Sequence, residues 1–133
     1  MDSRTANKYG PENNSSVLEL TDQDFNGIQL ISPKIKGKYC LLKIYAPWCG
    51  YCVRMTKDMN FLGNSLKKRD IPVASINFEQ NKELVGRIGS RGFPSMFVVD
   101  RSGKLNEVNM GSRSVLEMLK GLQKSIKTLE MSG

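Results

Sequence analysis

The stretch CLLKIYAPWCGYC, residues 40–52, decides the fold. It belongs to an apolar run, Tyr39–Ala46, that only Lys43 interrupts. Such a run is typical of a strand covered on both faces, as in a parallel sheet. Cys49 and Cys52 follow directly, with two residues between them. Apolar side chains then recur every three or four residues, as in an amphipathic helix: Cys52, Met55, Met59, Leu62 and Leu66.

The flanking sequence predicts the remaining elements. Further strands are expected over 17–20, 71–79, 94–100 and 104–110. Helices are expected from Thr21, which has Asp24 three residues on, over 81–89, and after the capping box of Ser114 and Glu117. This order predicts an α/β fold with helices flanking a mixed sheet, a parallel core plus an antiparallel hairpin. The domain is expected over 17–127, after a flexible segment, 1–16, and before a tail, 128–133.

Composition narrows the class of protein. The 133 residues carry a net charge of +7, from 20 Lys and Arg against 13 Asp and Glu. No nucleic-acid motif accompanies this charge, so a solvated basic surface is expected rather than a nucleic-acid site. No apolar run approaches the roughly 20 residues of a membrane helix. The N-terminus lacks the apolar core of a secretory signal, which predicts a cytoplasmic protein, and we expect a monomer.

The cysteines limit the chemistry. Three cysteines without histidine cannot supply the four ligands of a zinc site from one chain, and Cys–His catalysis is excluded. At a helix N-terminus, Cys49 would be favoured as a thiolate, with Cys52 one turn deeper. Gly50 would keep the backbone accessible, and Trp48 would shield one side of the sulfur. A redox pair, two ordinary thiols, and a metal or iron–sulfur site shared by two copies remain open. Cys40 is expected to be a small buried residue.

Two separated motifs carry a family resemblance. The segment YAPWCGYC resembles the active-site segment of the thioredoxin superfamily, especially single-domain thioredoxins and the catalytic domains of protein disulfide isomerases. The segment RGFPSMFVVDRSGK is similar to the cis-proline loop and following hairpin of that family, with Pro94 at the cis-proline position. The segment MGS, residues 110–112, resembles the glycine region before the last helix, and the whole resemblance runs from about Val17 to Ile126.

The resemblance implies roles for these residues. It makes Cys49 the attacking nucleophile and Cys52 the resolving thiol, with Phe93 and Pro94 packed against the disulfide. Protein disulfides would be the substrates, held by backbone pairing at Pro94 and by the apolar surface of Trp48, Tyr51 and Phe93. No cofactor is expected, and a reductase or an external thiol would recycle the pair. The alternatives are a binding or assembly module with vestigial redox activity, and a glutaredoxin.

Three positions depart from the family pattern. Gly50 and Tyr51 between the cysteines are neither the Gly-Pro of reductants nor the Gly-His of oxidants and isomerases, and because Gly-Tyr occurs in some disulfide isomerases, disulfide reshuffling stays open. Lys43 stands where the family has a buried acid, and Ser75 where it has the lysine that pairs with that acid. Lys43 either reaches the surface, favours the thiolate as a cation and so raises the redox potential, or acts as a neutral base for Cys52. Lys57 replaces a kinking proline, which predicts a straighter helix.

Overall fold

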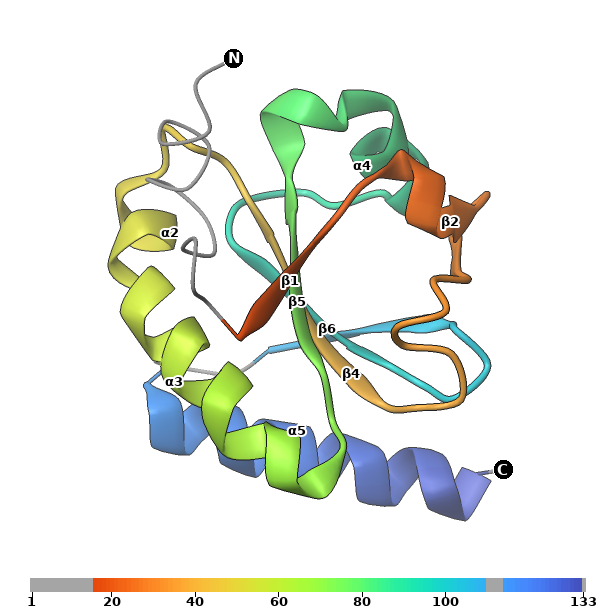
Figure 1. Cartoon of the computed structure of the whole chain (residues 1–133). Helices are drawn as coiled ribbons and strands as arrows, with labels where there is room; N and C mark the ends of the chain where they lie inside the picture. The colour runs from red at the N-terminus through yellow and green to blue at the C-terminus, as the bar shows by residue number, and fades with distance from the viewer. Residues whose placement is uncertain (1–15, 110–113, 133) are drawn as a thin grey trace.

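A five-stranded mixed sheet forms the centre of the molecule (Figure 1). The computed structural model describes residues 16–109 and 114–132. Of its four pairs of neighbouring strands, two are parallel and two are antiparallel, which confirms the predicted fold class. In spatial order the strands are β1 (Val17–Leu20), β5 (Val73–Asn77), β4 (Cys40–Tyr45), β6 (Ser95–Val99) and β7 (Leu105–Val108).

The helices cover the two faces of this sheet (Figure 1). One face packs against α3 (Thr56–Leu66) and α5 (Val115–Ser132). The opposite face packs against α4 (Lys82–Ile88) and the short hairpin of β2 (Phe25–Asn26) and β3 (Gln29–Leu30). Each face has its own cluster of buried apolar side chains, so β4 and β5 lie between two cores.

Local capping explains where several elements begin and end. The Thr21 hydroxyl accepts the backbone N–H of Gln23, and the Asp24 carboxylate accepts the backbone N–H of Thr21. The expected capping box is therefore present. It starts a single 3₁₀ turn, Asp22–Asp24, because the chain turns into β2 at Phe25. Gly89 ends α4 with a φ of 84°, a conformation that glycine adopts without a steric cost.

The C-terminal helix extends further than the sequence suggested. Residues 128–132, expected as part of a tail, are the last turns of α5. The Ser114 hydroxyl accepts the N–H of Glu117 at 3.3 Å at the start of this helix. The segment 1–15 and the MGS segment at 110–112 lie outside the described residues. No helix in the described part of the chain is long and apolar enough to cross a membrane.

The prediction of a straighter helix after the cysteines was wrong. The helix is interrupted at Met55, between α2 (Gly50–Arg54) and α3, although no proline is present. The Cys52 carbonyl accepts from the Thr56 hydroxyl and from Lys43 Nζ, each at 3.4 Å. A hydroxyl that bonds back to a carbonyl four residues earlier often bends a helix. These side-chain contacts therefore accompany the break where the family pattern has a proline.

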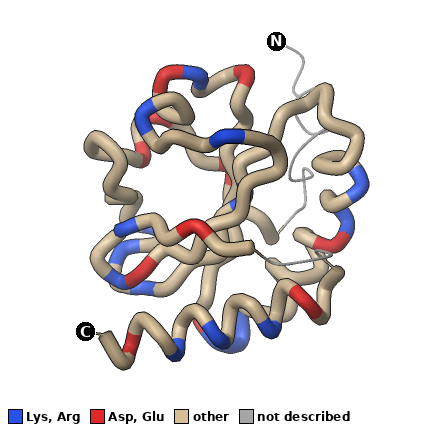
Figure 2. Tube along the Cα trace, turned by 180° about the vertical axis from the view of Figure 1, so that it is seen from behind, with Lys and Arg blue, Asp and Glu red and all other residues tan. Residues whose placement is uncertain are grey.

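Charge is spread over the surface rather than gathered in one stripe. Figure 2 shows Lys and Arg interspersed with Asp and Glu along the helices and loops of the described chain. Several of these charges are paired, as in the ion pair of Lys38 and Asp70 at 2.9 Å and that of Arg87 and Asp22 at 2.6 Å. This distribution fits the expected solvated basic surface.

Candidate active site

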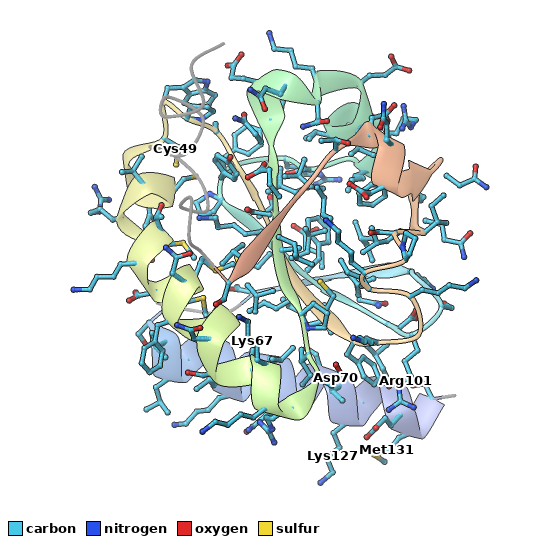
Figure 3. All side chains as sticks on the ribbon, in the orientation of Figure 1. Cys49, Lys67, Asp70, Arg101, Lys127 and Met131 are labelled. Atoms are coloured by element: carbon cyan, nitrogen blue, oxygen red, sulfur yellow. The ribbon has the colours of Figure 1, made fainter. Side chains whose placement is uncertain are left out.

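The two cysteines lie at the start of α2, directly after the central strand β4. Cys49 is the N-cap of this helix, and its N–H donates to the carbonyl of Ala46 at 3.0 Å. The Cys49 sulfur accepts the backbone N–H of Cys52 at 3.2 Å. Helix N-termini favour negative charge because their first N–H groups have no partner within the helix. The predicted position of the nucleophile at a strand-to-helix junction is therefore present (Figure 3).

The two thiols differ in their access to solvent. Cys49 is half-buried, whereas Cys52 is completely buried, and both are free thiols. Burial raises the pKa of the Cys52 thiol to about 12, and the Lys43 charge lowers it only in part. Cys40 is also completely buried, and burial raises the pKa of its thiol strongly. Solvent therefore reaches the Cys49 thiol, whereas the Cys52 thiol is closed to it.

The loop before β6 brings a distant segment against the first cysteine. The Cys49 thiol lies 3.6 Å from the carbonyl oxygen of Phe93, and the peptide bond from Phe93 to Pro94 is cis. The Ser95 hydroxyl, which donates to the Gly92 carbonyl at 2.6 Å, holds the loop in shape. The structure therefore joins the two segments on which the family resemblance rests.

Aromatic rings border the cysteines on one side. The Trp48 and Phe93 rings meet edge to face, with centroids 5.7 Å apart, and Phe93 packs on Phe78 at 4.8 Å. Trp48 is 65% exposed, yet its indole Nε1 donates to Glu79 Oε1 at 2.7 Å. This hydrogen bond, the largest cause, lowers the pKa of Glu79. Sequence reasoning missed Glu79, which binds the exposed indole, and Phe78, which packs on Phe93.

Of the two residues between the cysteines, Gly50 is exposed, whereas Tyr51 is half-buried and packs against the core on the α3 face. The guanidinium of Arg54 lies over the Tyr51 ring, 5.4 Å from its centroid. Gly50 is exposed, and a Cβ added there would approach only the Arg54 side chain, at 3.3 Å. Because a flexible side chain can move away, Gly50 leaves an open approach to the backbone beside Cys49, as expected.

Lys43 does not reach the surface. It is 1% exposed, and its Nζ donates to the Cys52 carbonyl at 3.4 Å and lies 5.3 Å from the centroid of the Tyr45 ring. Burial lowers the pKa of the Lys43 ammonium from 10.5 to about 8, although negative charge on Cys52 or Glu19 would raise it. A lysine with this pKa remains mainly protonated at pH 7. The cation is therefore buried against the backbone of Cys52.

Sequence reasoning missed Glu19 as a neighbour of Lys43. Glu19 is exposed at the edge of the sheet, but its carboxylate accepts from the buried Tyr45 hydroxyl at 3.2 and 3.3 Å. Burial of the carboxylate raises its pKa to about 7, and hydrogen bonds to Tyr45 and the Asn77 backbone oppose this rise. The family pattern suggested that the acid–base pair is lost at both ends. Both family positions do carry other residues, Lys43 and Ser75, and an acid lies near Lys43 on β1.

The part of the chain that the structure describes contains no cluster of side chains that could bind a metal ion. Residues 16–109 and 114–132 contain no group of three or more His, Cys, Asp or Glu side chains that could hold an ion.

Comparison with known proteins agrees with this geometry. The thioredoxin family model matches residues 16–124. The chain is 34% identical over 106 residues to a protein disulfide-isomerase of Ricinus communis, covering 77% of this chain and 20% of that protein. It is 31% identical over 98 residues to protein disulfide-isomerase A6 of Mus musculus, covering 74% of this chain and 21% of that protein. It thus spans about a fifth of the length of these relatives. The chain belongs to the thioredoxin family.

Proposed function

We propose that the protein is a thiol–disulfide oxidoreductase that acts on protein disulfides through Cys49 and Cys52. The observation that carries this proposal is the asymmetry of the pair, with a half-exposed thiol at a helix N-terminus above a buried one. An accessible thiol attacks and a buried thiol resolves. The similarity to proteins named protein disulfide-isomerase supports the same class of reaction.

The reaction proceeds in two exchanges. The Cys49 thiolate attacks one sulfur of the substrate disulfide, which forms a mixed disulfide and releases the other substrate sulfur as a thiolate that takes up a proton. Cys52 then loses its proton and attacks the Cys49 sulfur, which releases the second substrate thiol. Two electrons pass from the dithiol to the substrate, and the protein is left with a Cys49–Cys52 disulfide. The reverse sequence oxidises a substrate dithiol.

The surface around Cys49 offers a place for an extended substrate. Trp48 is exposed, and Tyr51 and Phe93 are half-buried, so the three rings present some aromatic surface. The Phe93 carbonyl, directly before Pro94, lies 3.6 Å from the Cys49 sulfur. A peptide would pair with this backbone while its apolar side chains contact the rings. A recycling reductase or external thiol would supply the electrons, and the exchange itself draws on no bound cofactor. The cytoplasmic location and the monomeric state stay predictions.

The buried Lys43 cation affects the redox potential of the cysteine pair. A positive charge beside the sulfurs stabilises the thiolate, which exists only in the reduced protein. Lys43 therefore favours reduction of the protein's own disulfide and raises its potential relative to a family member with an acid at this position. The protein is expected to be more oxidising than such a relative.

Insulin reduction with dithiothreitol as the electron source tests the activity. We expect turnover by the wild type and background rates for Cys49→Ser. Cys52→Ser should accumulate a mixed disulfide with insulin, because its resolving thiol is missing. An absence of turnover by folded wild type would contradict the proposal and favour a binding or assembly module. Reduction of a small mixed disulfide that depends on glutathione would instead favour a glutaredoxin.

A further inference from the structure

A row of three polar side chains crosses the sheet below the cysteines. Lys43 on β4 is in register with Ser75 on β5, and Ser75 is in register with Glu19 on β1. These three strands lie side by side (Figure 1). Residues in register on neighbouring parallel strands point to the same face of a sheet. All three side chains therefore belong to the face that carries α2 and α3.

The row runs from the core to solvent. Lys43 and Ser75 are 1% and 0% exposed, whereas Glu19 is exposed on the edge strand. Ser75 Oγ has no hydrogen-bond partner among the described residues, so its hydroxyl can turn toward either neighbour. The buried cation is thus separated from an acid at the rim by one small polar residue.

A second connection links the two charges. Tyr45 follows Lys43 by two residues on β4, and its ring lies beneath Lys43 Nζ. The hydroxyl of the same ring donates to the Glu19 carboxylate. The Tyr45 side chain therefore contacts both members of the pair and fixes Glu19 toward the interior of the sheet.

Few other charges act on Lys43 in the described part of the chain. From β6 the register partner is Met96, and the α2–α3 side supplies the apolar Met55 and Met59. Three groups with a negative form act on Lys43: Cys52, Glu19 and Cys49. Glu19 is the carboxylate among them, and, unlike the charge of the cysteines, its charge does not require a free thiolate.

We propose that Glu19 is a positioning residue that keeps Lys43 protonated beneath Cys52, so that the cation supports the attack of Cys52 on the mixed disulfide. This inference rests on the proposed function and assigns a part of it to the edge strand. A buried ammonium without a counter-ion loses its proton more readily. Removal of the Glu19 charge should therefore lower the pKa of Lys43, so that the cation is present beside Cys52 less often.

The proposal predicts a window of pH. Below about pH 6 Glu19 is protonated and acts like glutamine, since its pKa is about 7. Well above pH 8 Lys43 is neutral in either protein, since its pKa is about 8. Glu19 and Lys43 are both charged to a substantial degree only between these limits. The difference between wild type and Glu19→Gln should be largest near pH 7 to 8 and should shrink on either side.

Reaction of the reduced protein with the aromatic disulfide DTNB separates the two cysteines. Cys49 attacks the reagent and releases one coloured thiolate, and Cys52 then attacks the resulting mixed disulfide and releases a second. In Glu19→Gln we expect the second phase to slow about fivefold near pH 7.5, a coupling of ordinary size for neighbouring charges. The first phase should change by less than twofold.

A double-mutant cycle decides between electrostatic support and a merely structural role. In a Lys43→Met background Glu19→Gln should have no further effect on the second phase, because the cation it supports is absent. Glu107→Gln, which removes an exposed acid from the opposite edge strand, is the matched control and should have no effect in either background.

Either of two results would overturn the inference. One is a second phase in Glu19→Gln within twofold of wild type at every pH. The other is an equal slowing with and without Lys43, which would show that Glu19 acts on the fold. Failure of the proposed function would look different, because folded wild type would then reduce no insulin even if it released both thiolates from DTNB.

Discussion

The two faces of the central sheet differ although they share the same strands. On the face toward α4, β4 contributes Leu42 and Ile44 to a core without a charged side chain. On the face toward α3, the intervening residue is Lys43, beside Ser75. Because side chains alternate along a strand, one strand supplies a uniform core on one side and a reactive site on the other. The comparison shows that the buried Lys43 charge lies on the face that also carries polar side chains.

Moving the charge to the other face should have the largest effect. In Leu42→Lys the ammonium would lie in the apolar cluster without a carboxylate partner. We expect a loss of more than about 4 kcal/mol in the free energy of unfolding. Urea unfolding measures it, with Leu42→Met as a control that should cost under about 1.5 kcal/mol. A loss for Leu42→Lys as small as that of the control would show that the faces tolerate charge equally.

Removing the charge from its own face should stabilise the protein. The fall in the pKa of Lys43 from 10.5 to about 8 corresponds to about 3 kcal/mol at pH 7. Between these values the unfolded chain binds more protons than the folded protein, so wild-type stability rises with pH. Reduced Lys43→Met should therefore unfold at higher urea than wild type at pH 7. That advantage should disappear near pH 10.5, and an advantage unchanged with pH would contradict a buried cation.

The redox potential should respond more modestly. Lys43→Met should lower the potential of the Cys49–Cys52 couple by roughly 30 mV at pH 7, equivalent to about 1.4 kcal/mol, because the thiolate loses its cation. Equilibration with glutathione buffers measures this shift. Lys57→Met, which removes an exposed cation from α3, is the control and should leave the potential unchanged. A change below roughly 10 mV in Lys43→Met would remove the electrostatic role of Lys43.

Much of the fold followed from short-range patterns. The apolar run of β4 and the spacing of Cys49 and Cys52 placed the site at a strand-to-helix junction, because both are local properties of the chain. The capping box at Thr21 predicted where a helical turn begins. It did not predict that the turn is only Asp22–Asp24, since the length depends on where the chain next joins a strand.

The missed features depend on tertiary register. Glu19 and Lys43 are 24 positions apart, and only the pairing of β1 with β5 and of β5 with β4 brings them into one row. The family pattern has a lysine at Ser75, so it says nothing of Glu19, the acid on the next strand. The break in the helix at Met55 was missed for the same reason, since the Lys43 ammonium that bonds to the Cys52 carbonyl there comes from another element.

The complete burial of Cys40 gives the protein an internal reporter of opening. This thiol lies on the apolar face, with its Sγ directed to the carbonyl of Leu41 at 3.5 Å. A thiol reagent reaches it only when the core around it opens. In a protein with an oxidised Cys49–Cys52 pair, Cys40 is the remaining free thiol. The rate at which a thiol reagent labels it would therefore measure how often this core opens, without an engineered probe.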